Sequence, residues 1–214
     1  VTRADPHVVG PLHVALIQGN DKDRELTPAE IDARYLPASH FALARQVTDP
    51  VDLIVFPESS MDADPRTDPY VRSNLAAVAR AHHAWILANA SVDAPPDGHK
   101  LSNLDVLFDP AGRVQGTYSK RHLVPFGEFI PPLFGWVNRI THEAGDFAPG
   151  DRVVVFKVDA HNAGAFICYE SVFPDFVRQF VHNGAEVLTN ISTDGYVGHS
   201  AAHDQPSLLD PMRT

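Results

Sequence analysis

Short apolar runs alternate with helix-start signals in this chain, and this alternation limits the possible folds more than any other feature. Three apolar runs have the length of buried strands: residues 12–18, 53–56 and 85–90. Between them, Thr27-Pro28-Ala29-Glu30 matches a capping box with proline at the first helical position. Pro37 should interrupt that helical segment, which resumes over 41–47. Asp68-Pro69 predicts a second helix that runs to about His82.

The second half of the chain adds two predicted hairpins, a helix and another strand. The hairpin strands are residues 104–108 with 113–118, and 153–158 with 163–168. Asp109-Pro110-Ala111-Gly112 is a strong turn signal in the first hairpin, and His161-Asn162 marks the second. A helix over 174–183, ended by Gly184, precedes a strand at 187–191. Strand–helix alternation together with hairpins predicts an α/β domain with mixed sheets.

Length, charge and cysteine content narrow the class of protein. The chain has 214 residues, and 27 acidic against 17 basic side chains give a formal net charge of −10. An acidic chain without a run of Lys or Arg lacks the electrostatic footprint of nucleic-acid binding. No apolar stretch approaches the roughly 18 residues of a membrane-spanning helix, so the chain itself is expected to be soluble. A single cysteine excludes an internal disulfide.

Three chemically capable side chains stand where predicted strands end. Glu58 follows the run at 53–56, Lys120 follows the strand at 113–118, and Cys168 ends the strand at 163–168. Each has an ordinary structural explanation: a helix-capping carboxylate, a solvated edge charge and a buried structural thiol. Together they suit nucleophilic catalysis, because a carboxylate within hydrogen-bond reach can take the thiol proton as sulfur attacks an acyl carbon. We therefore expect the three side chains to converge in one pocket.

The order Glu58, Lys120, Cys168 resembles the Glu-Lys-Cys triad of the nitrilase (carbon–nitrogen hydrolase) superfamily. A narrower resemblance, to the catalytic domain of the apolipoprotein N-acyltransferase family, lies in residues 120–131, which read KRHLVPFGEFIP, and in residues 14–20 and 168–171. The resemblance implies a nitrilase-like α-β-β-α sandwich with mixed sheets. We expect a single domain over residues 1–214, curtailed at its C-terminus, with the likeness strongest over 12–192.

The resemblance also implies a role for each polar residue near the thiol. Glu58 would be the general base, and Lys120 would lower the thiol pKa and, with the N–H of Tyr169, hold the oxyanion. In the family a second glutamate orients the lysine, and that role falls on Glu128. Glu170 occupies a further acidic position beside the nucleophile.

The implied reaction has two steps and needs no metal or organic cofactor. A phospholipid acyl chain passes to Cys168 as a thioester, and the free amine of a lipid-modified N-terminal cysteine on a lipoprotein then takes it. The resemblance places such an enzyme in the bacterial cell membrane, with its catalytic domain on the extracytoplasmic side. A part absent from this chain would provide the membrane attachment.

The segment from Lys120 to Gly150 lacks periodicity and is interpreted as an ordered functional loop. Its apolar residues either pack on the core or form a lipid-facing lid beside the lysine, since an acyl chain needs an apolar wall. The lid candidates are Phe129, Ile130, Leu133, Phe134 and Trp136.

Two alternatives to the acyltransferase stay open. A soluble amidase or nitrilase-type hydrolase would use the same triad, with water in place of the amine. An inactive remnant or partner-binding domain would explain a curtailed C-terminus, although it has no physical need for all three triad residues. A zinc site is not favoured, because His199 and His203 have a helical ligand spacing but no convincing further ligands nearby.

Overall fold

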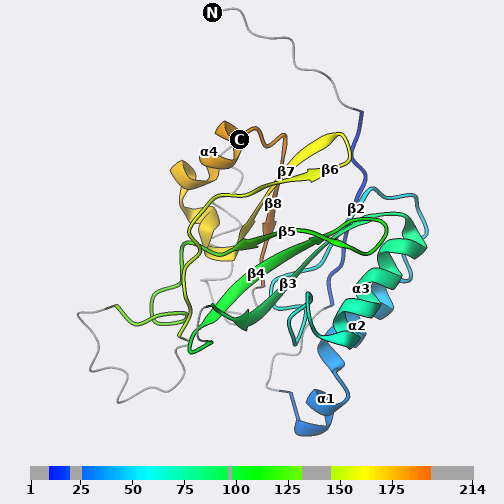
Figure 1. Cartoon of the computed structure of the whole chain (residues 1–214), viewed down its shortest axis with the longest axis horizontal. Coiled ribbons are helices and arrows are strands. Elements are labelled where there is room, and N and C mark those ends of the chain that lie inside the picture. The colour runs from blue at the N-terminus through cyan, green and yellow to red at the C-terminus, as the bar shows by residue number, and fades with distance from the viewer. Residues whose placement is uncertain (1–9, 20–25, 96–97, 132–145, 194–214) are drawn as a thin grey trace, which may run out of the picture.

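Two mixed β-sheets lie face to face in the computed structural model, which describes residues 10–19, 26–95, 98–131 and 146–193 (Figure 1). The larger sheet has the order β1-β2-β3-β4-β5 and the smaller one β6-β7-β8. Parallel pairs (β1–β2, β2–β3, β7–β8) and antiparallel pairs (β3–β4, β4–β5, β6–β7) occur together, which confirms the predicted mixed α/β class. The strands are β1 (Val14–Leu16), β2 (Leu53–Val55), β3 (Trp85–Asp93), β4 (Leu101–Phe108), β5 (Val114–Ser119), β6 (Val155–Val158), β7 (His161–Ile167) and β8 (Val187–Ile191).

Helices α1 and α3 begin where the capping signals predict. The described helices are α1 (Pro28–Asp32), α2 (Tyr35–Ala44), α3 (Pro69–His82), α4 (Pro174–His182) and a short 3-10 helix, η3 (Cys168–Val172). At α1 the Glu30 N–H donates to the Thr27 hydroxyl and the Thr27 N–H donates to the Glu30 carboxylate, so the capping box is complete. At α3 the Asp68 carboxylate accepts the Val71 N–H at 2.8 Å.

Two local predictions are wrong. α2 continues through Pro37, because this proline stands in the first turn, where its missing N–H costs no helical hydrogen bond. The turn between β6 and β7 lies at Asp159 and Ala160, whereas His161-Asn162 already belongs to β7. Asp159 has a φ of 51°, the left-handed conformation that a two-residue hairpin turn requires.

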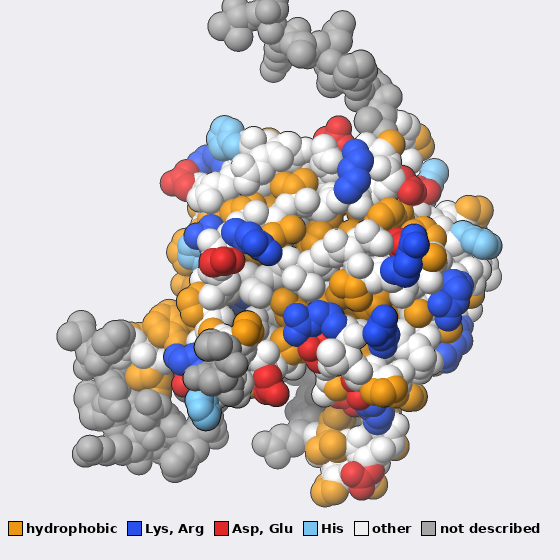
Figure 2. Space-filling model, viewed as in Figure 1, with side chains coloured by type: hydrophobic (Ala, Val, Ile, Leu, Met, Phe, Trp, Pro, Cys, Tyr) orange, Lys and Arg blue, Asp and Glu red, His pale blue; other side chains and the backbone are white. Residues whose placement is uncertain are grey.

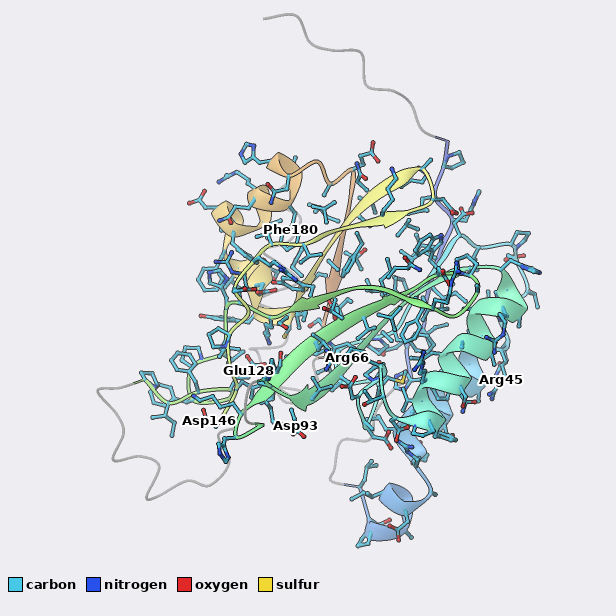
Figure 3. The ribbon with its side chains drawn as sticks, in the orientation of Figure 1. Arg45, Arg66, Asp93, Glu128, Asp146 and Phe180 are labelled. Carbon is cyan, nitrogen blue, oxygen red and sulfur yellow. The ribbon has the colours of Figure 1, made fainter. Side chains whose placement is uncertain are left out.

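Alternation along the central strands divides the hydrophobic core in two. Ile54 and Ile86 point to the face of the larger sheet that α2 and α3 cover, while Leu53 and Leu87 point to the smaller sheet. Phe180, drawn on α4 in Figure 3, is fully buried in this second cluster and joins the helix to both sheets. Removing each such side chain from water stabilises the fold by about 1.5–3 kcal/mol.

Neither the described helices nor the face drawn in Figure 2 shows the pattern of a membrane span or of a nucleic-acid-binding surface. No helix in the described ranges combines the length and apolarity needed to cross a bilayer. On the face shown in Figure 2, Lys and Arg side chains are spread out with acidic side chains among them. This arrangement differs from the continuous basic stripe that typifies nucleic-acid binding.

The sheet topology gathers functional side chains at one edge. β5 runs antiparallel to β4, which runs antiparallel to β3, so β2, β3 and β5 all end on the same side of the larger sheet. Glu58 follows β2 and Lys120 follows β5, so both lie at this edge. β4 starts there, which brings the buried Asn103 to the same place.

The described parts of the predicted functional loop are tied to this edge by backbone hydrogen bonds. The Gly150 N–H donates to the Lys120 carbonyl at 2.8 Å, and the Phe147 N–H donates to the Glu128 carbonyl at 2.9 Å. A Cβ at Gly150 would overlap the carbonyl oxygen of Ser119. The absence of a side chain at Gly150 therefore lets the returning loop pack against the backbone that carries Lys120.

This close approach predicts that Gly150→Ala destabilises the protein by about 1–3 kcal/mol, because the added methyl must displace backbone beside Lys120. Urea unfolding followed by circular dichroism would measure the loss. Gly10→Ala is the matched control, since a Cβ at Gly10 has no heavy atom within 4 Å. Equal stability of the two variants would contradict this account of the loop.

Candidate active site

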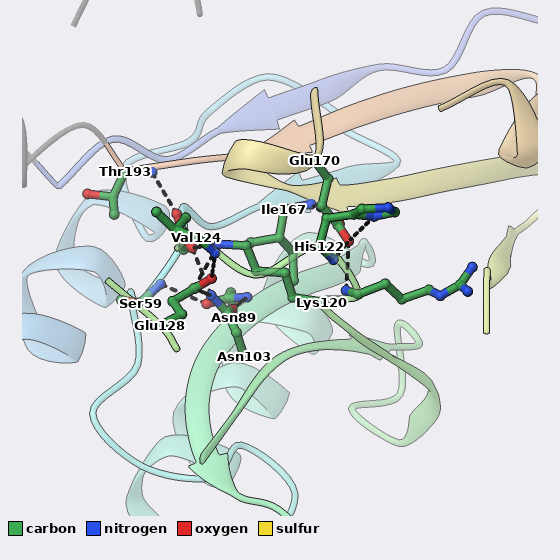
Figure 4. A network of polar contacts seen from close by, with 12 residues as sticks. Ser59, Asn89, Asn103, Lys120, His122, Val124, Glu128, Ile167, Glu170 and Thr193 are labelled. Atoms are coloured by element: carbon green, nitrogen blue, oxygen red, sulfur yellow. Dashed lines mark hydrogen bonds and ion pairs between the residues drawn. The ribbon is translucent and has the colours of Figure 1, made fainter. Parts of the chain in front are cut away.

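Glu58 is a buried carboxylate held by three donors. Its exposed fraction is only 4%, so an unpaired charge there would be costly. The Oε1 atom accepts the side-chain amide of Asn103 at 2.7 Å and the Lys120 Nζ at 3.2 Å. The Oε2 atom accepts the N–H of Thr193 at 3.2 Å, just after β8 (Figure 4). Residues from both sheets thus fix this carboxylate.

Lys120 is almost fully buried between two carboxylates. Its exposed fraction is 1%, and its Nζ lies 3.2 Å from Glu58 Oε1 and 2.8 Å from Glu128 Oε1. Burial alone would lower the pKa of Lys120, but the negative charges of Glu58 and Glu128 outweigh it and raise that pKa. The ammonium is therefore a fixed positive charge at neutral pH.

Glu128 reaches Lys120 from the loop that follows β5. Its Oε1 accepts the ammonium, and its Oε2 accepts the N–H of Val124 at 2.8 Å. The backbone thus fixes one carboxylate oxygen and leaves the other to orient the lysine. This contact is the one that the family role for Glu128 requires.

Cys168 stands at a sharp bend between β7 and η3. Its φ of 48° is unusual for a residue other than glycine and turns the chain abruptly as the strand ends. The thiol interacts with the carboxylate of Glu58 and the hydroxyl of Ser192, and it also feels the charge of Lys120. The structure therefore brings Glu58, Lys120 and Cys168 together, as the sequence predicts.

Lys120 lowers the pKa of the Cys168 thiol, as expected from the sequence, but the net pKa of the thiol is raised. Burial and the charge of Glu58 raise the pKa of Cys168 to about 11. The Ser192 hydrogen bond and Lys120 act in the opposite direction but do not prevail. A thiol that stays protonated at neutral pH needs a base at the moment of attack, and Glu58 is placed to be that base.

Glu170 connects the segments that carry Lys120 and Cys168 through hydrogen bonds. It is fully buried, and it accepts the Tyr118 hydroxyl, the Arg121 N–H and the Ile167 N–H, each within 2.8 Å. The His122 N–H adds a fourth donor at 3.1 Å. These donors come from β5, from the segment after Lys120 and from the end of β7, so one carboxylate joins the elements that carry the lysine and the thiol.

Other predicted site residues are placed only in part. The ring of Tyr169 packs against Phe173 with centroids 5.2 Å apart, and its N–H as an oxyanion donor stays a prediction. Phe129 and Ile130 follow Glu128 directly and are half-buried, as a lid would be. The remaining lid candidates lie outside the described residues: Leu133, Phe134 and Trp136.

The sequence interpretation missed a buried polar group behind Glu58. Asn89, Asn103 and Asp105 connect to that carboxylate through hydrogen bonds within the sheet. The available signal was the polar start of β4, where Ser102, Asn103 and Asp105 interrupt an otherwise apolar strand. Strand β4 was expected to begin only at residue 104, so Asn103 was left out of the sheet.

No cation site accompanies this polar cluster in the described ranges. There, no group of three or more His, Cys, Asp or Glu side chains is arranged to hold a metal ion. His199 and His203 lie outside the described residues.

Comparison with known proteins gives a consistent family match. The carbon-nitrogen hydrolase family model matches residues 13–214. An apolipoprotein N-acyltransferase of Geobacter metallireducens is 35% identical over 219 aligned residues, covering 97% of this chain and 41% of the relative. One of Azotobacter vinelandii is 30% identical, covering 95% of this chain and 40% of the relative. The chain thus spans about two fifths of the length of these curated relatives.

Solved structures share the fold. An amidase from Nesterenkonia sp. superposes with a TM-score of 0.65 at 20% identity, covering 94% of this chain and 71% of the amidase. A carbon-nitrogen hydrolase from Helicobacter pylori gives a TM-score of 0.62 at 18% identity, covering 94% of this chain and 66% of that protein. At this identity the likeness speaks for the architecture alone.

The electrostatics of the thiol predict the effect of removing the base. Glu58→Gln should lower the pKa of Cys168 below about 11, because the negative charge that disfavours the thiolate is gone. Acyl-enzyme formation at neutral pH should nevertheless fall by about 10²–10⁴-fold, since the general base is lost. The pH dependence of Cys168 alkylation measures the pKa. Asp109→Asn, a buried carboxylate bound to Arg113 elsewhere, is the control, and an unchanged thiol pKa in Glu58→Gln would contradict the geometry.

Proposed function

The chain belongs to the carbon–nitrogen hydrolase family, and we propose that it is the catalytic domain of an N-acyltransferase that moves a fatty acyl chain from phospholipid to the N-terminal amine of a lipoprotein. One observation carries the proposal: a buried ammonium, fixed by two carboxylates, lies beside a thiol at a strand-to-helix bend. That arrangement places a base (Glu58), a cation (Lys120) and a nucleophile (Cys168) together at one largely buried edge of the sheet.

In the first half-reaction Glu58 takes the proton of Cys168 as the sulfur attacks the ester carbonyl carbon of the phospholipid. The carbonyl π electrons move to oxygen, and the resulting oxyanion is stabilised by Lys120 and, in the family pattern, by the N–H of Tyr169. The tetrahedral centre collapses when the carbon–oxygen ester bond breaks. The leaving lysophospholipid oxygen receives the proton from Glu58, and a thioester remains on Cys168.

In the second half-reaction the N-terminal amine attacks the thioester carbon. Glu58, again charged, accepts the proton that the amine loses, and Lys120 stabilises the second oxyanion. The carbon–sulfur bond then breaks, the amide product leaves, and the sulfur of Cys168 recovers its proton from Glu58. Atoms and charges balance over the cycle without a cofactor.

Two observations favour the lipid acyltransferase over a soluble amidase. The acyltransferases of Geobacter metallireducens and Azotobacter vinelandii are 35% and 30% identical to this chain, whereas the amidase from Nesterenkonia sp. is 20% identical. In addition, Phe129 and Ile130 present half-buried apolar side chains directly after Glu128, where an acyl chain entering the site would need an apolar wall.

The amidase remains the second candidate, because the fold neighbours include an amidase and water could replace the amine in the same geometry. In that reaction the first half would cleave a carbon–nitrogen bond and the second would hydrolyse the thioester. The proposed membrane setting and extracytoplasmic location belong to the acyltransferase alone.

Intact mass spectrometry tests the proposal. After incubation with phospholipid vesicles the chain should gain the mass of one acyl chain, and Cys168→Ser should gain none because its hydroxyl is a far weaker nucleophile. A lipopeptide with a free N-terminal amine should then remove the acyl group and appear as an amide. Acylation by simple amides but not by phospholipid would favour the amidase. No adduct with either donor would favour the inactive domain.

The lysine contact gives a further expected outcome. Glu128→Gln keeps the shape but removes one of the two charges that orient Lys120, so acyl-enzyme formation should slow by about tenfold or more. Single-turnover kinetics with a phospholipid donor measure this step. Glu186→Gln is the matched control, because its carboxylate accepts the backbone N–H of Asn162 and contacts no triad residue. A rate equal to that of the control would remove Glu128 from the site.

A further inference from the structure

A chain of buried polar side chains lies beneath Glu58 and has no part in the proton transfers described above. Asn89 on β3 and Asn103 and Asp105 on β4 have exposed fractions of 0%, 3% and 0%. Asn89 lies opposite Asp105 in the strand register, so the three side chains share one face of the sheet. The Asn89 Nδ2 is 2.8 Å from both Asn103 Oδ1 and Asp105 Oδ1 (Figure 4 shows Asn89 and Asn103).

The backbone N–H of Ser59 sets the direction in which these groups donate. A backbone N–H can only donate, and the N atom of Ser59 lies 2.7 Å from Asn89 Oδ1, so that atom must be the amide oxygen. The Asn89 Nδ2 is then left to donate to Asp105 and Asn103. Asn103 uses its oxygen to accept, and must turn its own Nδ2 toward Glu58 Oε1 at 2.7 Å and Glu128 Oε1 at 3.4 Å.

This orientation decides which oxygen of Glu58 is open to the thiol. Asn103 and Lys120 both donate to Oε1, and a carboxylate oxygen accepts about two hydrogen bonds. The Oε2 atom accepts the N–H of Thr193 and, among the described residues, keeps one accepting position. That position is the one left for the proton of Cys168.

Asp105 closes the far end of the group. Its Oδ1 accepts from Asn89, and its buried Oδ2 has no hydrogen-bond partner in the described part of the chain. Burial raises the pKa of Asp105 well above its usual value; the Asn89 hydrogen bond opposes this, and the charges of Glu170 and Glu58 add to it. A neutral carboxylic acid still accepts through its carbonyl oxygen, so it can satisfy Asn89 without adding negative charge near Glu58.

We propose that Asn89 and Asp105 are positioning residues that act through Asn103, fixing its amide so that it donates to Glu58 Oε1 and reserves Oε2 for the proton of Cys168. The inference rests on the proposed function, in which Glu58 is the base. Without the Asn89 donor, the Asn103 oxygen would be buried without a partner, and the Asn103 amide would no longer be fixed in the plane that directs its Nδ2 to Glu58 Oε1. The Glu58 carboxylate would then turn more freely, and its Oε2 atom would face the thiol less often.

The test follows alkylation of Cys168, the only cysteine, by iodoacetamide across a range of pH, with intact mass as the readout. This reaction needs proton removal from the thiol but no natural substrate. Asn89→Leu should slow alkylation at neutral pH by about tenfold, because a carboxylate that is not held toward the thiol removes its proton less often. The other charged or titratable groups around Glu58 are unchanged in this variant: Lys120, Glu128, Cys168, Asp105 and Glu170.

A double variant tests whether Asn89 acts through Asn103. Asn89→Leu should not slow alkylation further in the Asn103→Leu background, because the first residue affects Glu58 only by way of the second. Asp105→Asn retains a carbonyl acceptor and should keep the wild-type alkylation rate, whereas Asp105→Leu should slow alkylation. Ser102→Ala is the matched control, since Ser102 is buried on the same strand and bonds to Ser119 instead.

The outcomes are separable. A lower unfolding temperature in Asn89→Leu with an unchanged alkylation rate would overturn the proposal, as would additive slowing in the double variant. If Asn89→Leu does not fold, Asp105→Leu decides by the same readout, because it leaves Asn89 and its bond to Ser59 in place. Slowing as expected in a protein that never accepts an acyl chain would reject the proposed function and leave the positioning role standing.

Discussion

The architecture of the site depends on one buried ammonium group. Lys120 is 1% exposed, and an isolated charge at such a position would cost several kcal/mol. Glu58 and Glu128 offset that cost, and each is fixed in turn by a backbone N–H, from Thr193 and Val124 respectively. These donors lie just after β8 and in the loop after β5. Lys120, Glu58 and Glu128 therefore have all their partners only when both sheets and the loop have packed together. The ion-pair cluster therefore specifies the geometry of this edge as much as it serves chemistry.

Glu170 has a complementary task at the same edge. It holds no charge partner comparable to Lys120, yet four donors from three segments converge on it. One of them is the N–H of Ile167, immediately before the bend at Cys168. A left-handed backbone at a non-glycine residue costs of order 1 kcal/mol or more and persists only where its surroundings over-determine it. The Glu170 carboxylate supplies that constraint, so the bend that carries the half-buried thiol depends on a buried acid.

Local sequence signals predicted two helix starts and the three strand ends that carry the triad, but they misplaced the β6–β7 turn and the interruption at Pro37. The caps at Thr27 and Asp68 located two helices, and strand-end polar residues located Glu58, Lys120 and Cys168. Properties that depend on residues far apart in the sequence could not be predicted from local signals. The pKa of the Cys168 thiol depends on its burial and on the opposite charges of Glu58 and Lys120, which follow other strands. The role of Asn89 depends on its position opposite Asp105 in the strand register. Pro37 misled because the start of α2 at a left-handed Arg34 has no sequence signature.

A protonated resting thiol suits a reaction in which one proton is used twice. In the proposed cycle Glu58 takes the proton only as sulfur attacks, and so holds it ready for the leaving oxygen. A hydrolase would need the same transfers, so the electrostatics of the triad are common to both reactions. The preference for an amine over water as the second nucleophile must then come from the side chains that cover the thioester. Phe129 and Ile130 follow Glu128 without a spacer, so the apolar wall in our proposal is anchored by the same carboxylate that orients Lys120. Closing that wall on an acyl chain would exclude water from the group that stabilises the oxyanion, which couples lipid binding to acyl transfer.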